Sequence, residues 1–259
     1  MPFALILVML IALGGAASVP SFAQQQRGPS APVSPEREYQ RCNQLVDQDA
    51  SAAFEFANGW LQRGGGDPAR HCVAMALMRL KRYGDAAQTL ERLADGMAAR
   101  NSPLRAEALQ QAAQAWLLAD QLERANATLT AALKLAPDAV DLMVDRATVL
   151  GLAKNYGAAI EDLNRALQRV PTRVDALVLR AVARRFLDQR EAAMADVEAA
   201  LKLDPRNIDA LLERGLQRRL AEDKAGARAD WMAVLSIGPE TAQGDDARLN
   251  LERLDVKSP

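Results

Sequence analysis

Apolar and polar positions alternate along this chain with the period of an α-helix, and the pattern is clearest in residues 140–173. There, one stripe of apolar side chains is followed by a short polar turn and a second stripe of the same spacing. The two stripes consist of Met143, Ala147 and Leu150, and of Ala159, Leu163, Ala166, Leu167 and Val170. Spacings of three and four residues place side chains on one face of an α-helix. The segment therefore predicts a pair of amphipathic helices, each about 20 Å long and packed against the other.

This helix pair repeats with a period of 34 residues. The prolines that close the second helices follow one another at that interval, at Pro137, Pro171, Pro205 and Pro239. Small residues recur in the same register, as Ala113, Ala147, Ala181 and Gly215 in the first helices and Ala125, Ala159, Ala193 and Ala227 in the second. Small side chains allow two helices to approach closely, and proline ends a helix because it has no backbone N–H to donate. A constant period of this length is typical of a solenoid, in which each unit buries apolar surface against its neighbours.

Six residues define the clearest unit: Ala147, Tyr156, Ala159, Leu163, Ala166 and Pro171. Their spacing resembles that of the tetratricopeptide repeat family. The resemblance extends over most of the chain after its N-terminal segment, and it implies an all-α fold, an α-solenoid of antiparallel helix pairs. Two positions depart from the family pattern: the first signature site, usually Trp, holds Met143 in this unit, and the next, usually Leu, holds Arg146.

The period predicts five units and two atypical ends. The five units are residues 67–100, 106–139, 140–173, 174–207 and 208–241, which together form a repeat region at 67–241. Five extra residues, 101–105, interrupt the period before the second unit. Residues 36–66 are expected to form a degenerate helix pair, and residues 242–259 a capping helix and tail. A terminal helix of this kind covers the apolar face that the last unit would otherwise expose.

The first 23 residues differ from the rest of the chain. They carry no charged side chain, and their apolar run ends in the small-x-small sequence Ser21-Phe22-Ala23. This pattern predicts a signal peptide at residues 1–23, cleaved after Ala23, and export of the chain to the periplasm or out of the cell. An uncleaved membrane anchor is the alternative. Residues 24–35, rich in Gln, Pro and Ser, are expected to form a flexible linker.

Cys42 and Cys72 are the two cysteines of the chain and lie 30 residues apart. In an exported protein an even pair predicts a disulfide, which would contribute about 3 kcal/mol to the free energy of unfolding. Two small buried side chains with free thiols are the alternative interpretation.

Three units share an arginine in the first helix and an aspartate 16 residues later. The pairs are Arg146 with Asp162, Arg180 with Asp196, and Arg214 with Asp230. The two preceding units have neither residue at these positions. This matched presence and absence predicts structural ion pairs, either between the two helices of a unit or between neighbouring units. The alternative is a ladder of arginines that binds an acidic ligand.

By the resemblance, the first helices line a concave groove in which partners bind. The groove positions become less polar toward the C-terminus, from His71 in the first unit through Gln110 in the second to the last three units. There the predicted partner-binding residues are Val144, Thr148, Leu152, Val178, Val182, Phe186, Leu212, Leu216 and Leu220. They predict an apolar cleft for a segment with spaced hydrophobic side chains, unless neighbouring helices cover them. The clamp by which some family members hold a C-terminal carboxylate is absent, because Gln110, Val144 and Val178 replace its polar and basic residues.

Composition narrows the chemistry that this chain can perform. It has 259 residues with 32 basic and 33 acidic side chains, so a formal net charge of −1 gives it no general attraction to nucleic acid. One His and two Cys do not complete the usual set of zinc ligands. His71 and Cys72 are neighbours in sequence, so their side chains diverge by about 100° on a helix and do not form a catalytic pair. We therefore expect no enzyme, no metal and no cofactor.

Taken together, these patterns predict a non-catalytic scaffold of the cell envelope that binds a protein or peptide partner through the groove of a solenoid. A homo-oligomer that forms through the same apolar residues is the alternative. No motif in the sequence identifies the partner.

Overall fold

The helix pattern of the sequence is present throughout the computed structural model, which describes residues 34–255. No strand occurs in this range, and the predicted all-α class is confirmed. The thirteen α-helices of the range are α1 (Pro35–Gln48), α2 (Ala50–Gln62), α3 (Gly66–Arg79), α4 (Tyr83–Gly96), α5 (Ser102–Leu118), α6 (Leu122–Leu135), α7 (Val140–Leu152), α8 (Tyr156–Arg169), α9 (Val174–Phe186), α10 (Arg190–Leu203), α11 (Ile208–Leu220), α12 (Lys224–Ile237) and α13 (Ala242–Asp255). The predicted signal peptide and nearly all of the predicted linker lie outside the described residues.

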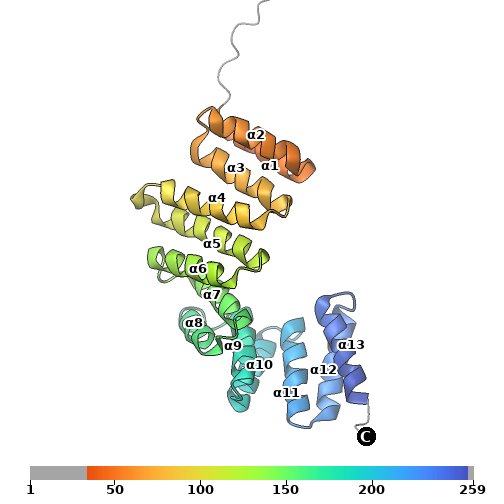
Figure 1. Ribbon diagram of the computed structural model, residues 1–259. Helices are drawn as coiled ribbons and strands as arrows, with labels where there is room; N and C mark the ends of the chain where they lie inside the picture. The colour runs from red at the N-terminus through yellow and green to blue at the C-terminus, as the bar shows by residue number, and fades with distance from the viewer. Residues whose placement is uncertain (1–33, 256–259) are drawn as a thin grey trace, which may run out of the picture. The chain divides into compact units, whose positions relative to one another are not determined.

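Each helix packs against the helix before it and the helix after it, from α1 to α13 (Figure 1). The connections are short, so consecutive helices run in opposite directions. The first helices of neighbouring pairs also touch, since α7 contacts α9, α9 contacts α11, and α11 contacts α13. Contacts confined in this way to adjacent hairpins define an α-solenoid, as the sequence predicts. All of these helices belong to one compact unit that begins at Pro35.

The small residues of the repeat lie where helices cross. They include Ala147, Ala159 and Ala166, which are 0–3% exposed. The last unit shows why size matters at these crossings. A Cβ on Gly215 would lie 2.3 Å from Nε1 of Trp231, a fully buried residue of α12. Trp231 stands where the two preceding units hold Val197 and Leu163, and the glycine makes room for the larger ring.

Five helix pairs, from α3–α4 to α11–α12, turn through one residue in the left-handed backbone region. These residues are Lys81, Asp120, Lys154, Asp188 and Glu222, with φ between 57° and 62°. After α7, the N–H of Lys154 donates to the carbonyl of Gly151 (3.0 Å), and that of Asn155 donates to the carbonyl of Leu150 (2.8 Å). Such bonds satisfy carbonyl groups that the end of a helix leaves without a partner.

The extra residues at 101–105 lengthen a helix rather than form a loop. A short 3₁₀ turn at Ala99–Asn101 leads directly into α5, which has 17 residues, whereas α3, α7, α9 and α11 have 13 or 14. Pro103 in the first turn suits a helix start, because a backbone N–H would have no helical partner there.

The described stack ends with α13, which packs against α12 and α11. Its buried residues are Gly244, Ala247 and Asn250. Across residues 34–255, no helix combines the length and the apolar character needed to span a lipid bilayer.

Candidate partner-binding face

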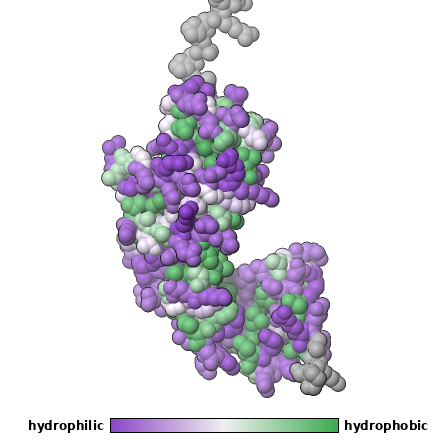
Figure 2. All heavy atoms as spheres, viewed as in Figure 1, coloured by the Kyte–Doolittle hydropathy of each residue, from purple (hydrophilic) through white to green (hydrophobic). Residues whose placement is uncertain are grey.

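The predicted partner-binding residues lie on α7, α9 and α11, and we call these nine positions the first-helix face. In order of decreasing exposure, they are Leu152, Phe186 and Leu220 (40–56% exposed), then Thr148, Val182, Leu212 and Leu216 (half-buried), and finally Val144 and Val178 (6–7% exposed). The face is therefore neither fully open nor fully covered. The two valines pack into the core and support the face from below. Figure 2 shows apolar surface in the part of the chain that holds α7, α9 and α11, with hydrophilic atoms around it.

A cavity of about 350 Å³ lies between α7, α8 and α9. Leu152, Val182 and Phe186 of the face line it, together with Thr148 and Tyr156. The rings of Tyr156 and Phe186 are stacked, with centroids 4.6 Å apart and planes 4° apart. Stacking holds the Phe186 ring in position although the residue is 54% exposed. This part of the face therefore has a fixed aromatic wall.

A second cavity of about 450 Å³ lies between α9 and α11. Its lining is partly polar and includes Asp175 and Asp209, and its apolar part consists of Val178, Leu179, Val182, Leu212 and Leu216. On one side, Nε of Arg185 donates a hydrogen bond to Oε1 of Glu213 (2.7 Å), and Nε2 of Gln217 donates to the same oxygen (2.9 Å). Glu213 is 3% exposed, so this ion pair neutralises a buried charge. Because Leu179 and Val182 line both cavities, the two cavities share one continuous wall.

The three arginine–aspartate pairs each join the first and second helices of one unit. The distances from Nε and Nη2 to the two carboxylate oxygens are 2.7 and 2.7 Å for Arg146–Asp162, 2.9 and 2.7 Å for Arg180–Asp196, and 3.0 and 2.6 Å for Arg214–Asp230. The aspartates are only 3–4% exposed. Hydrogen bonding to Asp162 raises the pKa of Arg146. The guanidinium groups are thus engaged by internal carboxylates, which favours the structural interpretation over a ladder for an acidic ligand.

Two of these arginines, Arg146 and Arg180, also reach the preceding unit. Nη1 of Arg146 donates to the Thr130 hydroxyl on α6 (3.1 Å), and Nη1 of Arg180 donates to the side-chain oxygen of Asn164 on α8 (2.8 Å). One side chain therefore connects three helices, two of its own unit and one of the unit before.

Two further arginines in this network were not predicted from the sequence. Arg184 donates to Asp196 (2.6 Å), and Arg218 donates to Asp230 (2.8 Å), so each of these carboxylates accepts bonds from two guanidinium groups. The sequence does contain a signal for them, because Arg184 and Arg218 are 34 residues apart and occupy the same position of the last two units.

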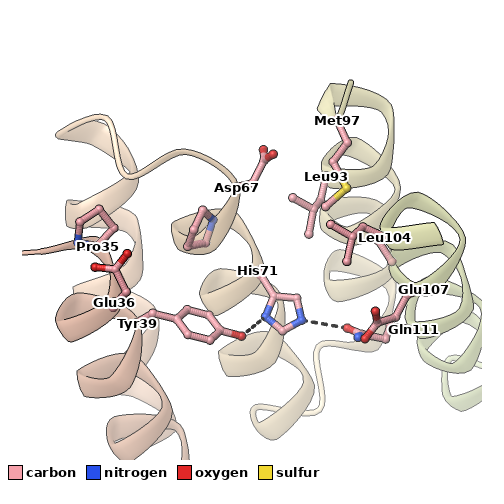
Figure 3. Close-up of a pocket in the computed structure, with 12 residues that line it drawn as sticks. Pro35, Glu36, Tyr39, Asp67, His71, Leu93, Met97, Leu104, Glu107 and Gln111 are labelled. Atoms are coloured by element: carbon pink, nitrogen blue, oxygen red, sulfur yellow. Dashed lines mark hydrogen bonds between the residues drawn. The ribbon is translucent and has the colours of Figure 1, made fainter. Parts of the chain in front are cut away.

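At the other end of the stack, a disulfide joins Cys42 on α1 to Cys72 on α3, and both residues are fully buried. Cys72 is therefore not a thiol nucleophile beside His71. His71 instead makes hydrogen bonds to the Tyr39 hydroxyl through Nδ1 (2.7 Å) and to Oε1 of Gln111 through Nε2 (3.0 Å), as Figure 3 shows. The three side chains come from α1, α3 and α5 and line a cavity of about 430 Å³. No group of three or more His, Cys, Asp or Glu residues within 34–255 is arranged to hold a metal ion.

Helix pairs stacked in a row, with an apolar surface on the first helices, define this chain as a helical repeat protein of the solenoid class. The family profile for the tetratricopeptide repeat matches residues 174–207, which hold α9 and α10. The fold is that of solved tetratricopeptide repeat proteins. A comparison of the sequence with curated proteins gave no match.

Several solved structures share this fold at low sequence identity. The C-terminal part of a TPR repeat-containing protein from Cytophaga hutchinsonii is 13% identical, with a TM-score of 0.62 over 84% of this chain and 95% of that chain. MamA of Desulfovibrio magneticus RS-1, from residue 41 to its end, is 20% identical, with a TM-score of 0.57 over 74% of this chain and 97% of that chain. YrrB, described as a TPR protein with an unusual peptide-binding site, is 16% identical, with a TM-score of 0.54 over 74% of this chain and 96% of that chain.

Proposed function

We propose that this protein is a non-catalytic scaffold that binds a protein or peptide partner through the first-helix face. The observation that carries the proposal is the exposure of Leu152 and Phe186 beside two apolar cavities with a common wall. Large apolar side chains that are exposed together, at the edge of preformed cavities, are typical of surfaces that bind other proteins. The charged side chains that line the second cavity have partners, since Asp175 pairs with Arg173, Asp209 with Gln243, and Glu213 with Arg185. The apolar side chains are therefore the part of that lining that a partner can contact.

A partner segment with apolar side chains spaced along one side fits this face best. The cavities lie between α7 and α9 and between α9 and α11, so they offer two pockets one repeat apart. Extended and helical segments both present side chains at regular intervals along one side. The peptide-binding site described for YrrB, which has the same fold, supports a peptide as the partner.

Export to the cell envelope is part of the proposal. The disulfide between Cys42 and Cys72 supports an oxidising compartment. The uncharged apolar sequence of residues 1–23 supports a signal peptide. In this proposal the five repeats at residues 67–241 form the binding region, and α13 caps its last unit.

The double variant Leu152→Ser/Phe186→Ser tests the face. It should weaken binding of the natural partner at least about tenfold, because two large apolar contacts are lost. The partner is isolated on the immobilised protein from its native source and identified, and its affinity is then measured by calorimetry. The matched control is Leu203→Ser, which removes a 46% exposed leucine at the end of α10, outside both cavities. Equal affinities for the double variant and the control would contradict the proposal.

A second copy of the chain is the alternative occupant of the same apolar surface. Light scattering distinguishes the two cases. A dimer that dissociates in the double variant but not in the Leu203→Ser control assigns the face to self-association. A monomer in all three proteins assigns it to a different partner.

A further inference from the structure

Glu107 on α5 stands between two neighbouring cavities and lines both. The first, of about 430 Å³, is formed by α1, α3, α4 and α5 and contains His71 (Figure 3). The second, of about 410 Å³, is formed by α5, α6 and α7. Gln111, one turn after Glu107, also lines both. We call this pair the Glu107 cavities.

The Glu107 cavities continue into the first-helix face. Thr148 lines the second of them and also lines the cavity beside Phe186. Leu179 and Val182 connect that cavity to the next one, between α9 and α11. Shared lining residues therefore join four cavities in a single row that follows the first helices from α1 to α11.

The lining of the Glu107 cavities carries acidic side chains and no Lys or Arg. The carboxylates are Glu36, Asp67 and Glu107 in the first cavity, and Glu107 and Asp145 in the second. Arg70 approaches Asp67 (3.4 Å), and Nε2 of Gln110 donates to Asp145 (2.6 Å). Glu107 forms no hydrogen bond or ion pair with any residue that the structure describes. It is exposed, so its charge is available to a bound molecule.

Two neighbouring groups, Tyr39 and Asp145, have raised pKa values. The pKa of Tyr39 is raised by burial and, in addition, by the carboxylate of Glu107. The pKa of Asp145 is raised by burial and by Asp141 and Asp175, against the opposing effects of Gln110 and Arg173. Burial is the largest cause of both shifts, and nearby carboxylates add to each.

The other walls of the first cavity are apolar. Leu93, Met97, Leu104 and Ala108 line it, and Leu104 is 54% exposed. A lysine or arginine side chain matches this combination, because its aliphatic stem packs on apolar surface while its charged end lies beside carboxylates and other acceptors.

We propose that the Glu107 cavities bind lysine or arginine side chains of the polypeptide partner whose apolar side chains occupy the first-helix face. This inference rests on the proposed function and makes it specific: the partner segment is basic where it lies along α1 to α7 and apolar where it lies along α7 to α11. Electrostatic complementarity of this kind fixes the direction of a bound segment and disfavours acidic competitors.

A displayed library of random peptides, selected on the immobilised protein, supplies the probe. The recovered peptides should combine lysine or arginine with apolar residues. One of them is labelled with a fluorophore, and its affinity is measured by anisotropy for the wild-type protein and for Glu107→Gln. The variant should bind about threefold to fivefold more weakly, because one ionic contact is lost.

Glu123→Gln is the matched control, since it removes the same charge from an exposed position on α6 that lines neither cavity. Its affinity should equal that of the wild-type protein. A peptide with its basic residues replaced by glutamine should bind the wild-type protein more weakly. Its affinity should be the same for Glu107→Gln as for the wild-type protein, because a double-mutant cycle gives this result when the two changed groups are in contact.

The outcomes separate this inference from the proposed function. Apolar peptides without enrichment in Lys or Arg, or equal affinity of the wild-type and Glu107→Gln proteins, would overturn the inference and leave the proposed function intact. If no recovered peptide depends on Leu152 and Phe186, the proposed function itself is wrong.

Discussion

Asp196 is the centre of the ion-pair network in the fourth repeat. It is 4% exposed and accepts hydrogen bonds from Arg180 and Arg184, whose side chains are only 17% and 20% exposed. This carboxylate lies beside the positive charges of two guanidinium groups that have little access to water. Loss of one member of a buried pair is costly mainly because it leaves the other charge without a partner.

Replacement of this carboxylate should therefore destabilise the protein strongly. We expect Asp196→Ala to lower the free energy of unfolding by about 3 kcal/mol or more. Urea denaturation followed by circular dichroism measures the change. The control is Asp138→Ala, because Asp138 pairs with Arg169 at the surface, where the two side chains are 67% and 57% exposed, and it should cost less than about 1 kcal/mol. Similar small losses for both variants would show that the network does not stabilise the interior.

Individual partners are the least predictable feature of this sequence. The 34-residue period predicts Arg180 with Asp196, because the two residues are present or absent together. It does not predict that Arg185 pairs with Glu213, 28 residues further along, because Asp188 and Glu191 are carboxylates that lie nearer to Arg185 in the sequence. Which carboxylate an arginine reaches depends on how adjacent units pack, and the sequence pattern of a single unit does not contain that information.

At the scale of the elements, the disulfide attaches α1 to the repeats that follow. Cys42 on α1 and Cys72 on α3 enclose α2 between them, and their Cα atoms are 6.1 Å apart. In a solenoid each unit contacts only its neighbours, so a local crosslink stabilises mainly the helices it joins.

Removal of the disulfide should have a local effect. The variant Cys42→Ala/Cys72→Ala should be less stable by about 3 to 4 kcal/mol, as expected for a loop of this length. Hydrogen exchange should become faster in α1, α2 and α3 and should remain unchanged in α9 to α12. A thiol assay on the unreduced wild-type protein provides the control and should detect no reactive thiol. Two reactive thiols, or faster exchange throughout the chain, would contradict this account of the N-terminal helices.

The elements themselves follow well from the sequence. Spacings of three and four residues predict the helices, and proline and the polar turns predict where they end. The extra residues at 101–105 show the limit of such reasoning, because a break in the period does not reveal whether it forms a loop or, as here, another turn of helix.

At the scale of the whole molecule, the first helices present a row of cavities whose chemistry changes along the chain. The row begins with the carboxylates around Glu107 and ends with cavities around Phe186 and Leu212, and in the second of these, apolar side chains lie beside charged groups that are paired with one another or with neighbouring polar groups. The sequence predicts the apolar end, since the repeat register places those side chains on one side of their helices. It does not predict the Glu107 cavities, because they are assembled from six helices, α1 and α3 to α7, and the first cavity includes residues of α1, which lies before the repeats.

Site-specific photocrosslinking in the native cells tests the central claim, that the first helices form a partner-binding face. A photoreactive amino acid is placed, one position at a time, at Leu152 and Phe186 on the face and at Glu161 and Leu203 on second helices. We expect the two positions on the face to give an adduct with the same polypeptide and the two positions on second helices to give none. Adducts formed equally from all four positions, or from the second helices alone, would contradict the claim.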